Sequence, residues 1–200
     1  MHDDEGLRER LVRAGAELVA EEGSAAVSLR EIARRAGVSH GAPRRYFPTH
    51  VELLSAIARV GFADLTTRLR GEGEPPARRR TAGEDGSARD RLAVLARAYV
   101  AFAQEHRGMY ELMFRHDLLR SDRLGLRETS LPLFETLAHL LAEARGEHTP
   151  AVTAAGAFWA NLHGIVQLWL WGSLPLATGQ DDIGALVDAA LDAHTTRRDA

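Results

Sequence analysis

The sequence contains neither cysteine nor lysine among its 200 residues. The absence of cysteine excludes disulfide bonds, thiolate catalysis and zinc fingers whose metal is held by cysteine. Because lysine is absent, arginine supplies all 25 of the side chains counted as Lys plus Arg. Long apolar runs are also missing. The most apolar stretch, residues 158–171, is interrupted by Asn161, His163 and Gln167, and it falls short of the roughly 18 apolar residues of a membrane span.

The N-terminal ten residues are acidic and lack the apolar stretch of a secretory signal. A hydrophobic content of 45% can fill a core, and 200 residues fit one large or two small domains at roughly 100–200 residues per domain. We therefore expect a soluble globular protein located in the cytoplasm.

The net charge of −3 has the wrong sign for attraction to nucleic acid. That attraction, however, depends on the charge of the face that makes the contact rather than on the total. Residues 24–50 carry five arginines and a single carboxylate, Glu31. One short segment of an otherwise acidic chain is therefore basic.

The N-terminal part of the chain has the pattern of helices joined by short turns. Apolar residues at helical spacing predict a first helix over residues 7–22. Ser28 and Glu31 have the spacing of a capping box, which predicts the start of a second helix. Gly37 can adopt the left-handed conformation that ends a helix, so the second helix is expected to stop near Ala36.

A short third helix is predicted next, because Ser39 is a suitable N-cap and Pro48 follows Phe47. A longer fourth helix is expected to reach Leu69. Two short helices joined by a turn that contains glycine form a helix-turn-helix, whose second helix can lie in the major groove of DNA. The basic segment coincides with this predicted motif.

The remainder of the chain also has a helical pattern. Residues 71–90 lack large apolar groups and are expected to form a mobile loop. Beyond them no alternating strand pattern occurs, and helical periodicity recurs at about 89–106, 107–116, 130–145, 150–172 and 181–197. The fold class is therefore expected to be all-α.

Over about residues 7–60 the chain resembles the TetR family of bacterial regulators. The resemblance lies in residues 28–54, SLREIARRAGVSHGAPRRYFPTHVELL, where several features agree in order and spacing. It implies a helix-turn-helix DNA-binding head at residues 1–50. It also implies a helical regulatory domain at residues 51–200, which binds ligand and dimerises.

The resemblance implies two sets of DNA contacts. Base contacts are expected at Arg30, His40, Gly41, Ala42 and Arg45, and phosphate contacts at Ser28, Arg44, Tyr46 and His50. Arg45 is the best reader of sequence, because a guanidinium can donate two hydrogen bonds to guanine. The small side chains of Gly41 and Ala42 would let the third helix lie deep in the groove.

Three positions depart from the family pattern. Arg44 stands where the family often has tyrosine, and Pro43 stands where an apolar residue is usual. Pro43 should be tolerated, because a missing N–H costs little in the first turn of a helix. His50 stands where lysine is usual, and an unperturbed imidazole is mostly neutral at pH 7, so its phosphate contact should be weaker. Arg34 and Arg35 are expected to be solvated rather than bound to DNA.

The motif Trp159-Ala-Asn-Leu-His-Gly164 resembles the Trp-x-x-x-His-Gly pattern of one C-terminal domain class of this family, the WHG domain, over about residues 90–197. Gly156, Ala160 and Gly164 recur every four residues, so one ridge of this helix is bare and another helix could approach it closely. The resemblance implies a homodimer formed through the last two helices. Such a dimer would hold two recognition helices about 34–36 Å apart, as a palindromic site requires.

An inducer pocket is expected in the C-terminal domain, for a small hydrophobic or aromatic molecule. Its expected lining is Tyr99, Phe102, Met109, Met113, Phe114, Trp159 and His163. The alternative is that these residues are packed core, as methionine and aromatic residues at helical spacing usually are. His163 could donate to a ligand or could bond to a neighbouring helix.

Two other function classes fit the sequence less well. An enzyme is disfavoured, because the chain lacks a His-Glu-x-x-His metal motif, a Gly-x-Ser-x-Gly elbow and the Gly-Lys-Ser/Thr of a P-loop. No catalytic residue, metal or cofactor is therefore expected. A structural helical adaptor remains possible, but it would have no need of a basic helix. The favoured function is a ligand-responsive repressor that binds a palindromic operator in double-stranded DNA.

Overall fold

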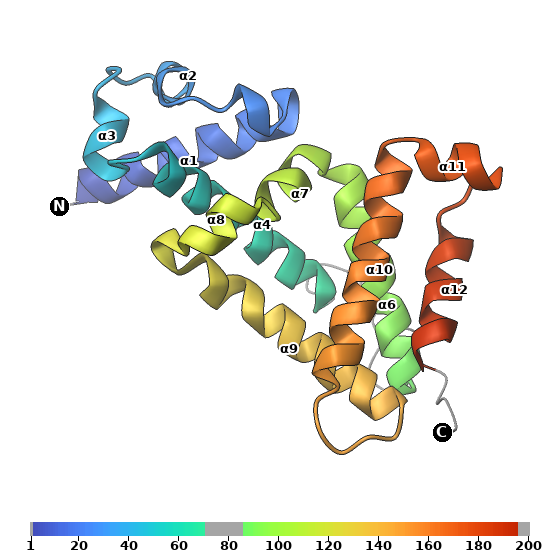
Figure 1. Cartoon of the computed structure of the whole chain (residues 1–200). Helices are drawn as coiled ribbons and strands as arrows, with labels where there is room; N and C mark the ends of the chain where they lie inside the picture. Colours follow the sequence, from blue (N-terminus) through green and yellow to red (C-terminus); the bar gives the residue numbers. More distant parts are fainter. Residues whose placement is uncertain (1, 71–85, 196–200) are drawn as a thin grey trace. The chain divides into compact units, whose positions relative to one another are not determined.

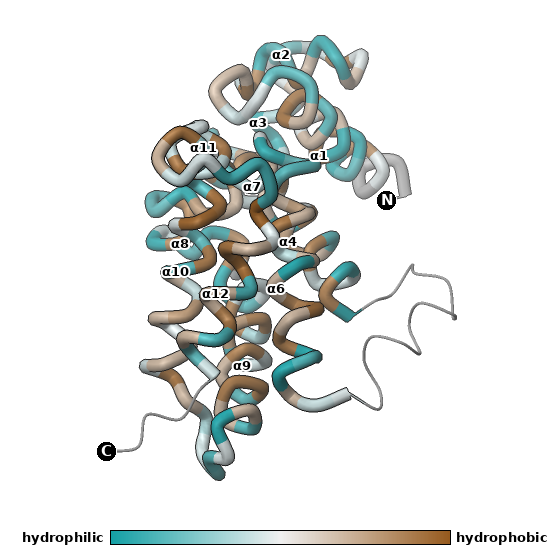
Figure 2. Tube along the Cα trace, turned by 90° about the vertical axis from the view of Figure 1, so that its right-hand side faces the viewer, coloured by the Kyte–Doolittle hydropathy of each residue, from teal (hydrophilic) through white to brown (hydrophobic). Residues whose placement is uncertain are grey.

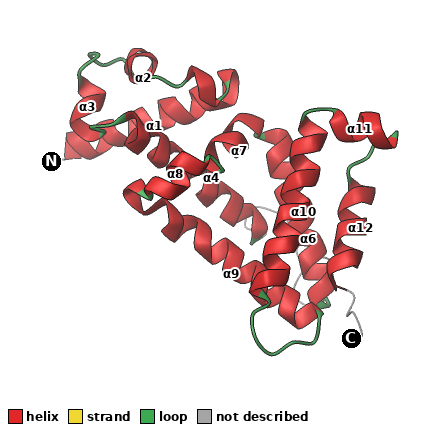
Figure 3. Cartoon of the chain, in the orientation of Figure 1, coloured by secondary structure: helices red, strands yellow, loops and turns green. Residues whose placement is uncertain are grey.

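The computed structural model describes residues 2–70 and 86–195, and its regular structure within these ranges is helical throughout (Figure 3). The expected all-α fold class is confirmed. Residues 71–85 of the expected mobile loop lie outside the described residues.

The end of the expected loop is helical. Helix α6 (Ala88–Glu105) begins inside the range 71–90. The Ser87 Oγ accepts from the Asp90 N–H at 3.2 Å, and the Asp90 carboxylate accepts from the Ser87 N–H at 3.0 Å. This reciprocal capping box starts the helix without large apolar groups, which is why low hydrophobicity alone extended the predicted loop too far.

Within the described ranges the chain divides into two compact units. The first comprises residues up to Asp64 together with Glu105–Ser130, and the second comprises Leu65–Gln104 together with the residues from Leu131 onward. These units are defined by compactness, whereas the expected boundary at residue 50 divides the chain by function. That boundary therefore stays a prediction.

The first unit begins with the three-helix head. Its helices are α1 (His2–Glu22), α2 (Leu29–Arg35) and α3 (Ala42–Tyr46), with a 3-10 turn at Ser24–Ala26, and helix α4 (His50–Leu69) follows. Leu11, Ile32 and Phe47 are fully buried and hold these helices together. Ala33 is also fully buried, whereas Val38, in the turn after α2, is only half-buried.

Helix α3 is shorter than the expected span from Ser39 to Phe47, and Ser39 is not its N-cap. The N-cap is Gly41, and the Ser39 carbonyl instead accepts from the Ala42 N–H at 2.9 Å in a tight turn. An α-helix starting at Ser39 would need a bond from the N–H of Pro43 to the Ser39 carbonyl, and proline has no N–H. Pro43 is tolerated in the first turn, as expected.

Two short helices complete the first unit, α7 (Arg107–Met113) and α8 (His116–Ser121). Helix α7 packs against α1, where a methyl group at Gly108 would clash with the Val19 carbonyl. The sequence pattern predicted one helix over 107–116, but the structure ends it at Met113 and starts α8 separately.

The second unit contains most of the C-terminal chain. Its helices are α6, most of α9 (Leu126–Ala144), α10 (Val152–Leu170), α11 (Ser173–Thr178) and α12 (Gly184–Thr195). Hydrophobic and hydrophilic residues alternate along α6 and α9 in Figure 2, which is the pattern of helices with one buried face. Helix α12 packs against α10, and Arg97 of α6 pairs with Asp188 of α12 at 2.7 Å.

The sequence pattern missed two features of the second unit. Helix α9 starts at Leu126 rather than near 130 and contains Pro132. Helix α11 lies between Gly172 and Gly179, whose φ angles of 76° and 68° both lie in the left-handed region. Six residues between two glycines are too few to show helical periodicity, so this element had no detectable signal.

Candidate nucleic-acid interface

Local hydrogen bonds fix both ends of α2. The Ser28 Oγ accepts from the Glu31 N–H at 3.2 Å, which is the predicted N-cap. At the other end Gly37 has a φ of 66°, and the Val38 N–H donates to the Ala33 carbonyl at 3.0 Å. This is the Schellman arrangement that ends a helix and turns the chain. The predicted start and stop signals of α2 are confirmed.

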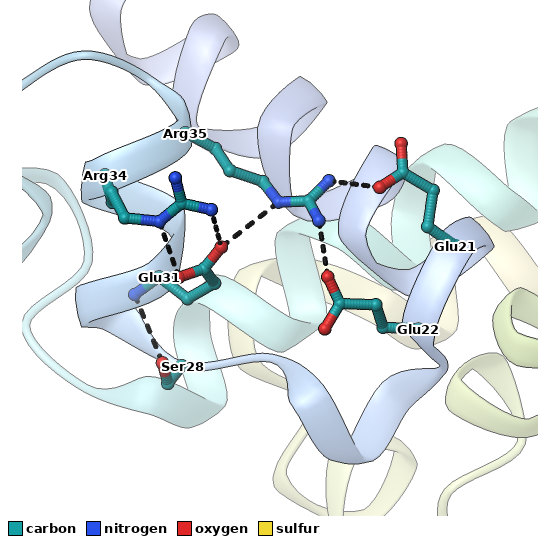
Figure 4. A network of polar contacts seen from close by, with 6 residues as sticks. All are labelled: Glu21, Glu22, Ser28, Glu31, Arg34 and Arg35. Carbon is teal, nitrogen blue, oxygen red and sulfur yellow. Dashed lines mark hydrogen bonds and ion pairs between the residues drawn. The ribbon is translucent and has the colours of Figure 1, made fainter.

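The Glu31 carboxylate does not reach back to the cap but joins a network of charges (Figure 4). It accepts from Arg34 at 2.6 and 2.9 Å and from Arg35 at 3.3 Å. Arg35 also donates to Glu21 at 2.6 Å and to Glu22 at 2.5 Å. The hydrogen bonds from Arg34, followed by those from Arg35, lower the pKa of Glu31 from 4.5 to about 2.

This network corrects the expectation that Arg34 and Arg35 are both solvated. The Arg34 side chain is 67% exposed, as expected, but the Arg35 side chain is only 19% exposed. Arg35 ties α2 to the C-terminal end of α1, because Glu21 and Glu22 are the last two residues of α1. Three carboxylates therefore occupy two of the five arginines that made this segment basic.

The other three arginines of the basic segment have different surroundings. Arg30, Arg44 and Arg45 are exposed, and they form no hydrogen bond or ion pair with residues 2–70 or 86–195. Arg44 and Arg45 lie in the last turn of α3, and Arg30 lies in the first turn of α2. Their guanidinium donors are available to a molecule outside this chain.

The start of α3 presents a surface almost without side chains. Gly41 is exposed, and a Cβ atom built there would meet no other residue within 4 Å. His40 precedes it in the exposed turn, Ala42 follows it half-buried, and Tyr46 ends the helix half-buried. A nucleic acid could therefore approach the backbone here closely.

His50 is the first residue of α4, and its Nε2 lies 2.9 Å from the Val27 carbonyl oxygen. A carbonyl can only accept, so Nε2 carries the proton of this hydrogen bond. In the neutral ring Nδ1 then has no proton and cannot donate to a phosphate. This gives a structural reason for the weaker phosphate contact expected at this position.

In the second unit, two of the expected ligand residues bond to one another. The Tyr99 hydroxyl lies 2.9 Å from Nδ1 of His163, and the Trp159 ring lies edge-on to His163 with centroids 5.9 Å apart. Burial lowers the pKa of His163, which favours the neutral ring. The alternative in which His163 bonds to a neighbouring helix is therefore the one that the structure shows, since Tyr99 lies on α6.

Three of the other expected lining residues belong to the first unit. Met109 and Met113 pack against Gly61 of α4, and Phe114 contacts Phe62 edge-on with ring centroids 5.7 Å apart. The fourth, Phe102, is fully buried in the second unit, where the Arg68 guanidinium lies over its ring. These contacts are those of packed core residues.

Comparisons with known proteins identify the family. A family model for bacterial regulatory proteins of the tetR family matches residues 11–57. A second model, for a tetracyclin repressor-like C-terminal domain, matches residues 92–194, which is more than half of the chain. The chain belongs to the TetR family of transcriptional regulators.

Solved structures share this fold. A protein of unknown function from Rhodococcus sp. RHA1 is 30% identical, with a TM-score of 0.74 and coverage of 94% of this chain and 93% of that chain. The multidrug binding protein EbrR, complexed with imidazole, is 24% identical, with a TM-score of 0.59 and coverage of 96% of each chain. RolR, complexed with resorcinol, is 23% identical, with a TM-score of 0.63 and coverage of 96% of this chain and 89% of that chain. No curated protein sequence matches.

As a TetR-family transcriptional regulator, the protein binds DNA, and the region that matches the tetR model includes α2 and α3. The match to the C-terminal model includes Tyr99, Trp159 and His163. Within the described ranges there is no cluster of His, Asp or Glu that could hold a metal ion, and no helix is long and apolar enough to cross a membrane.

Sequence reasoning missed the contacts that position the TetR-family head. The Glu31–Arg35 pair has the (i, i+4) spacing of a helical ion pair and could have been found from the sequence. The bonds from Arg35 to Glu21 and Glu22 could not, because they depend on how α1 and α2 pack. The same holds for Arg10, which donates to the Ala36 carbonyl at 2.7 Å.

Proposed function

We propose that this TetR-family protein is a ligand-responsive repressor, which binds a palindromic operator as a homodimer and is released by a small apolar inducer. The observation that carries the proposal is the set of exposed arginines without partners among the described residues, Arg30, Arg44 and Arg45, beside the bare surface at Gly41. A protein surface that leaves guanidinium donors unused next to exposed backbone is suited to a nucleic acid.

The proposed roles at the operator follow from side-chain chemistry. Arg45 would read a guanine, Arg44 would bind a phosphate, and Arg30 would reach a base from the start of α2. His40, Gly41 and Ala42 would face the bases, and Ser28, Tyr46 and His50 would contact the backbone. The Ser28 hydroxyl uses its oxygen as the cap of α2, so its proton is available for a phosphate oxygen.

The proposed dimer interface lies on α10 and α12. A Cβ atom at Gly156 or Gly164 would meet no other residue within 4 Å, so the small-residue ridge of α10 is open along its length. Two large apolar side chains near the end of α10, Leu168 and the C-cap residue Trp171, are 39% and 64% exposed. Exposed apolar surface of this kind marks an interaction site, and a second copy of the chain is the proposed partner.

The proposed inducer site centres on Tyr99, Trp159 and His163 in the second unit. Two of the similar solved structures are complexes with small ring compounds, imidazole in EbrR and resorcinol in RolR, and an aromatic group beside an imidazole suits such molecules. Phe102, in the same unit, remains a proposed lining residue, whereas Met109, Met113 and Phe114 belong to the first unit and are left out of this site. Inducer would favour a conformer in which the two heads no longer match the operator. The free energy of operator binding would then weaken by the difference between the free energies with which inducer binds the two conformers.

A footprint on the chain's own promoter region tests the repressor directly. We expect a protected palindrome whose half-sites are about one helical turn apart, or a multiple of that distance. Transcription from this promoter in vitro should fall when the protein is added, and an inducer found by thermal-shift screening should restore it. Protection with increased transcription would instead make the protein an activator. No protection at low salt would contradict the proposal.

Sedimentation tests the dimer separately. Gly164→Arg places a long charged side chain on the open ridge of α10, where a Cβ atom would meet no other residue within 4 Å. We expect the wild type to sediment as a dimer and Gly164→Arg as a folded monomer. Asp181→Arg is a suitable control, because it also adds an arginine at an exposed position, but outside α10 and α12. A monomeric wild type at micromolar concentration would contradict the proposed interface.

A further inference from the structure

Helix α1 supplies an arginine to the end of the recognition helix. The N-terminal half of α1 runs beside α3 in the first unit (Figure 1), and the two helices are in contact. Arg8 is exposed, and its guanidinium carbon lies over the ring of Phe47, 5.2 Å from the ring centroid. Phe47 directly follows α3 and is fully buried, with its N–H donated to the Pro43 carbonyl at 2.8 Å. A cation is therefore held against the C-terminal end of α3.

The contact with Phe47 leaves the hydrogen-bond donors of Arg8 unused. A cation–π interaction uses the face of the ring and takes none of the five N–H groups of the guanidinium. Among the described side chains of residues 6–70 and 86–195, Arg8 has no hydrogen-bond or ion-pair partner. Arg10 on the same helix differs, because it donates to the Ala36 carbonyl at 2.7 Å. Arg8 is therefore positioned by an aromatic ring with its donors unused, whereas Arg10 already donates a hydrogen bond within the protein.

We propose that Arg8 is a further DNA-contacting residue, which binds a backbone phosphate at the edge of the major groove that α3 enters. This inference rests on the proposed docking of α3. The planar guanidinium matches two phosphate oxygens, and holding it over Phe47 reduces the side-chain entropy lost on binding. A phosphate contact fixes the register of the protein on the duplex without reading a base.

The test compares Arg8→Met with Arg13→Met. Methionine keeps an apolar cover over Phe47 and removes only the charge and the donors. Arg13 is an exposed arginine on the same helix that lacks a partner within the described ranges, and five residues along a helix place it on a different face. The two variants therefore change the net charge equally but remove the arginine from different places.

Fluorescence anisotropy would measure both variants on a duplex selected from a random pool and on a shuffled duplex, over a series of salt concentrations. For Arg8→Met we expect affinity to fall on both duplexes by a similar factor, roughly 3- to 30-fold, and the slope of log K against log salt to decrease by about 1. We expect Arg13→Met to keep the wild-type affinity and slope.

Two results would overturn the proposal. Wild-type affinity and slope in Arg8→Met would show that Arg8 only covers Phe47. Reduced affinity with an unchanged slope would show that Arg8 acts through packing. Thermal melting shows whether Arg8→Met folds, and if it does not, Arg8→Gln replaces it in the same measurements of affinity and slope. Arg45→Ala on the same duplexes tests the docking of α3 independently, because its loss should be confined to the selected duplex.

Discussion

Two pairs of adjacent arginines lie ten residues apart in the head, and they have opposite surroundings. Arg34 and Arg35, at the end of α2, are bound by Glu21, Glu22 and Glu31. Arg44 and Arg45, at the end of α3, are exposed and have no partner among residues 2–70 and 86–195. The same dipeptide therefore holds the head together at one place and is open to solvent at the other. We call Arg34 and Arg35 the occupied pair, and Arg44 and Arg45 the open pair.

The difference shows that a count of charges does not locate a nucleic-acid surface. The three carboxylates around Arg35 come from two helices, and only one of them lies within the basic segment. Of the five arginines in the basic segment, the three without partners among the described residues lie on α3 and at the start of α2. The acidic net charge of −3 is then compatible with DNA binding.

The largest effect is expected at the open pair. Arg45→Ala should weaken operator binding by about 1–3 kcal/mol and relax specificity at one base pair, because a base-reading arginine is lost. Arg44→Ala should weaken binding to operator and random duplexes alike, as the loss of a phosphate contact does. Anisotropy on both duplexes checks this, and equal losses for Arg45→Ala on the two would contradict its role as a reader.

Two glycines sharpen the comparison, because one follows the occupied pair and the other precedes the open pair. Gly37→Ala should cost about 1 kcal/mol of unfolding free energy, since an L-residue is strained at a φ of 66°, and should not alter the salt dependence of DNA binding. Gly41→Leu should fold normally, because its Cβ would meet nothing, but should lose DNA affinity by roughly tenfold or more through steric conflict.

Thermal denaturation and DNA titration measure both glycine variants. A Gly41→Leu protein that binds operator as tightly as the wild type would show that the surface at the start of α3 does not face DNA.

Within the occupied pair, we expect the two arginines to contribute unequally to stability, and Arg35→Met tests the larger contribution. This change leaves Glu21, Glu22 and Glu31 without the guanidinium that joins them, so α2 should loosen from α1. We expect the melting temperature to fall by about 3–6 °C at neutral pH. Arg34→Met is the control and should change it by less than about 1 °C, because Arg34 is 67% exposed and bonds only within α2. Equal shifts for the two variants would argue against the tie to α1.

The smallest effect is expected in how the stability contributed by the Glu31 network depends on pH. Because the pKa of Glu31 is lowered from 4.5 to about 2 in the folded chain, its contribution to stability is present above about pH 4.5 and is lost as the pH falls toward 2. The difference in melting temperature between wild type and Glu31→Gln should therefore shrink through this window. Arg34→Met should move the loss to higher pH, because Arg34 is the largest cause of the shift. A difference that does not vary with pH would contradict this account.

The sequence was sufficient to predict the long helices, because apolar periodicity and local caps such as Ser28 and Gly37 act over a few residues. It failed for α3, whose start depends on the missing N–H of Pro43, and for α11, which is too short to show a period.

The candidate site was predictable in a different way. The expected DNA contacts came from the resemblance to the TetR family, and the structure shows that Arg30, Arg44 and Arg45 among them have no partner within the described ranges. The tie from Arg35 to Glu21 and Glu22 could not be predicted, because it joins side chains on two helices whose crossing no local pattern specifies. The same reason applies to Arg8 over Phe47.

The salt dependence of DNA binding tests the central claim most directly. The double variant Arg44→Met/Arg45→Met should bind operator more weakly, and its slope of log K against log salt should be smaller by about 1 or more. The double variant Arg34→Met/Arg35→Met removes the same charge and should keep the wild-type slope. Equal reductions of the slope in both double variants would contradict the division between an occupied and an open pair.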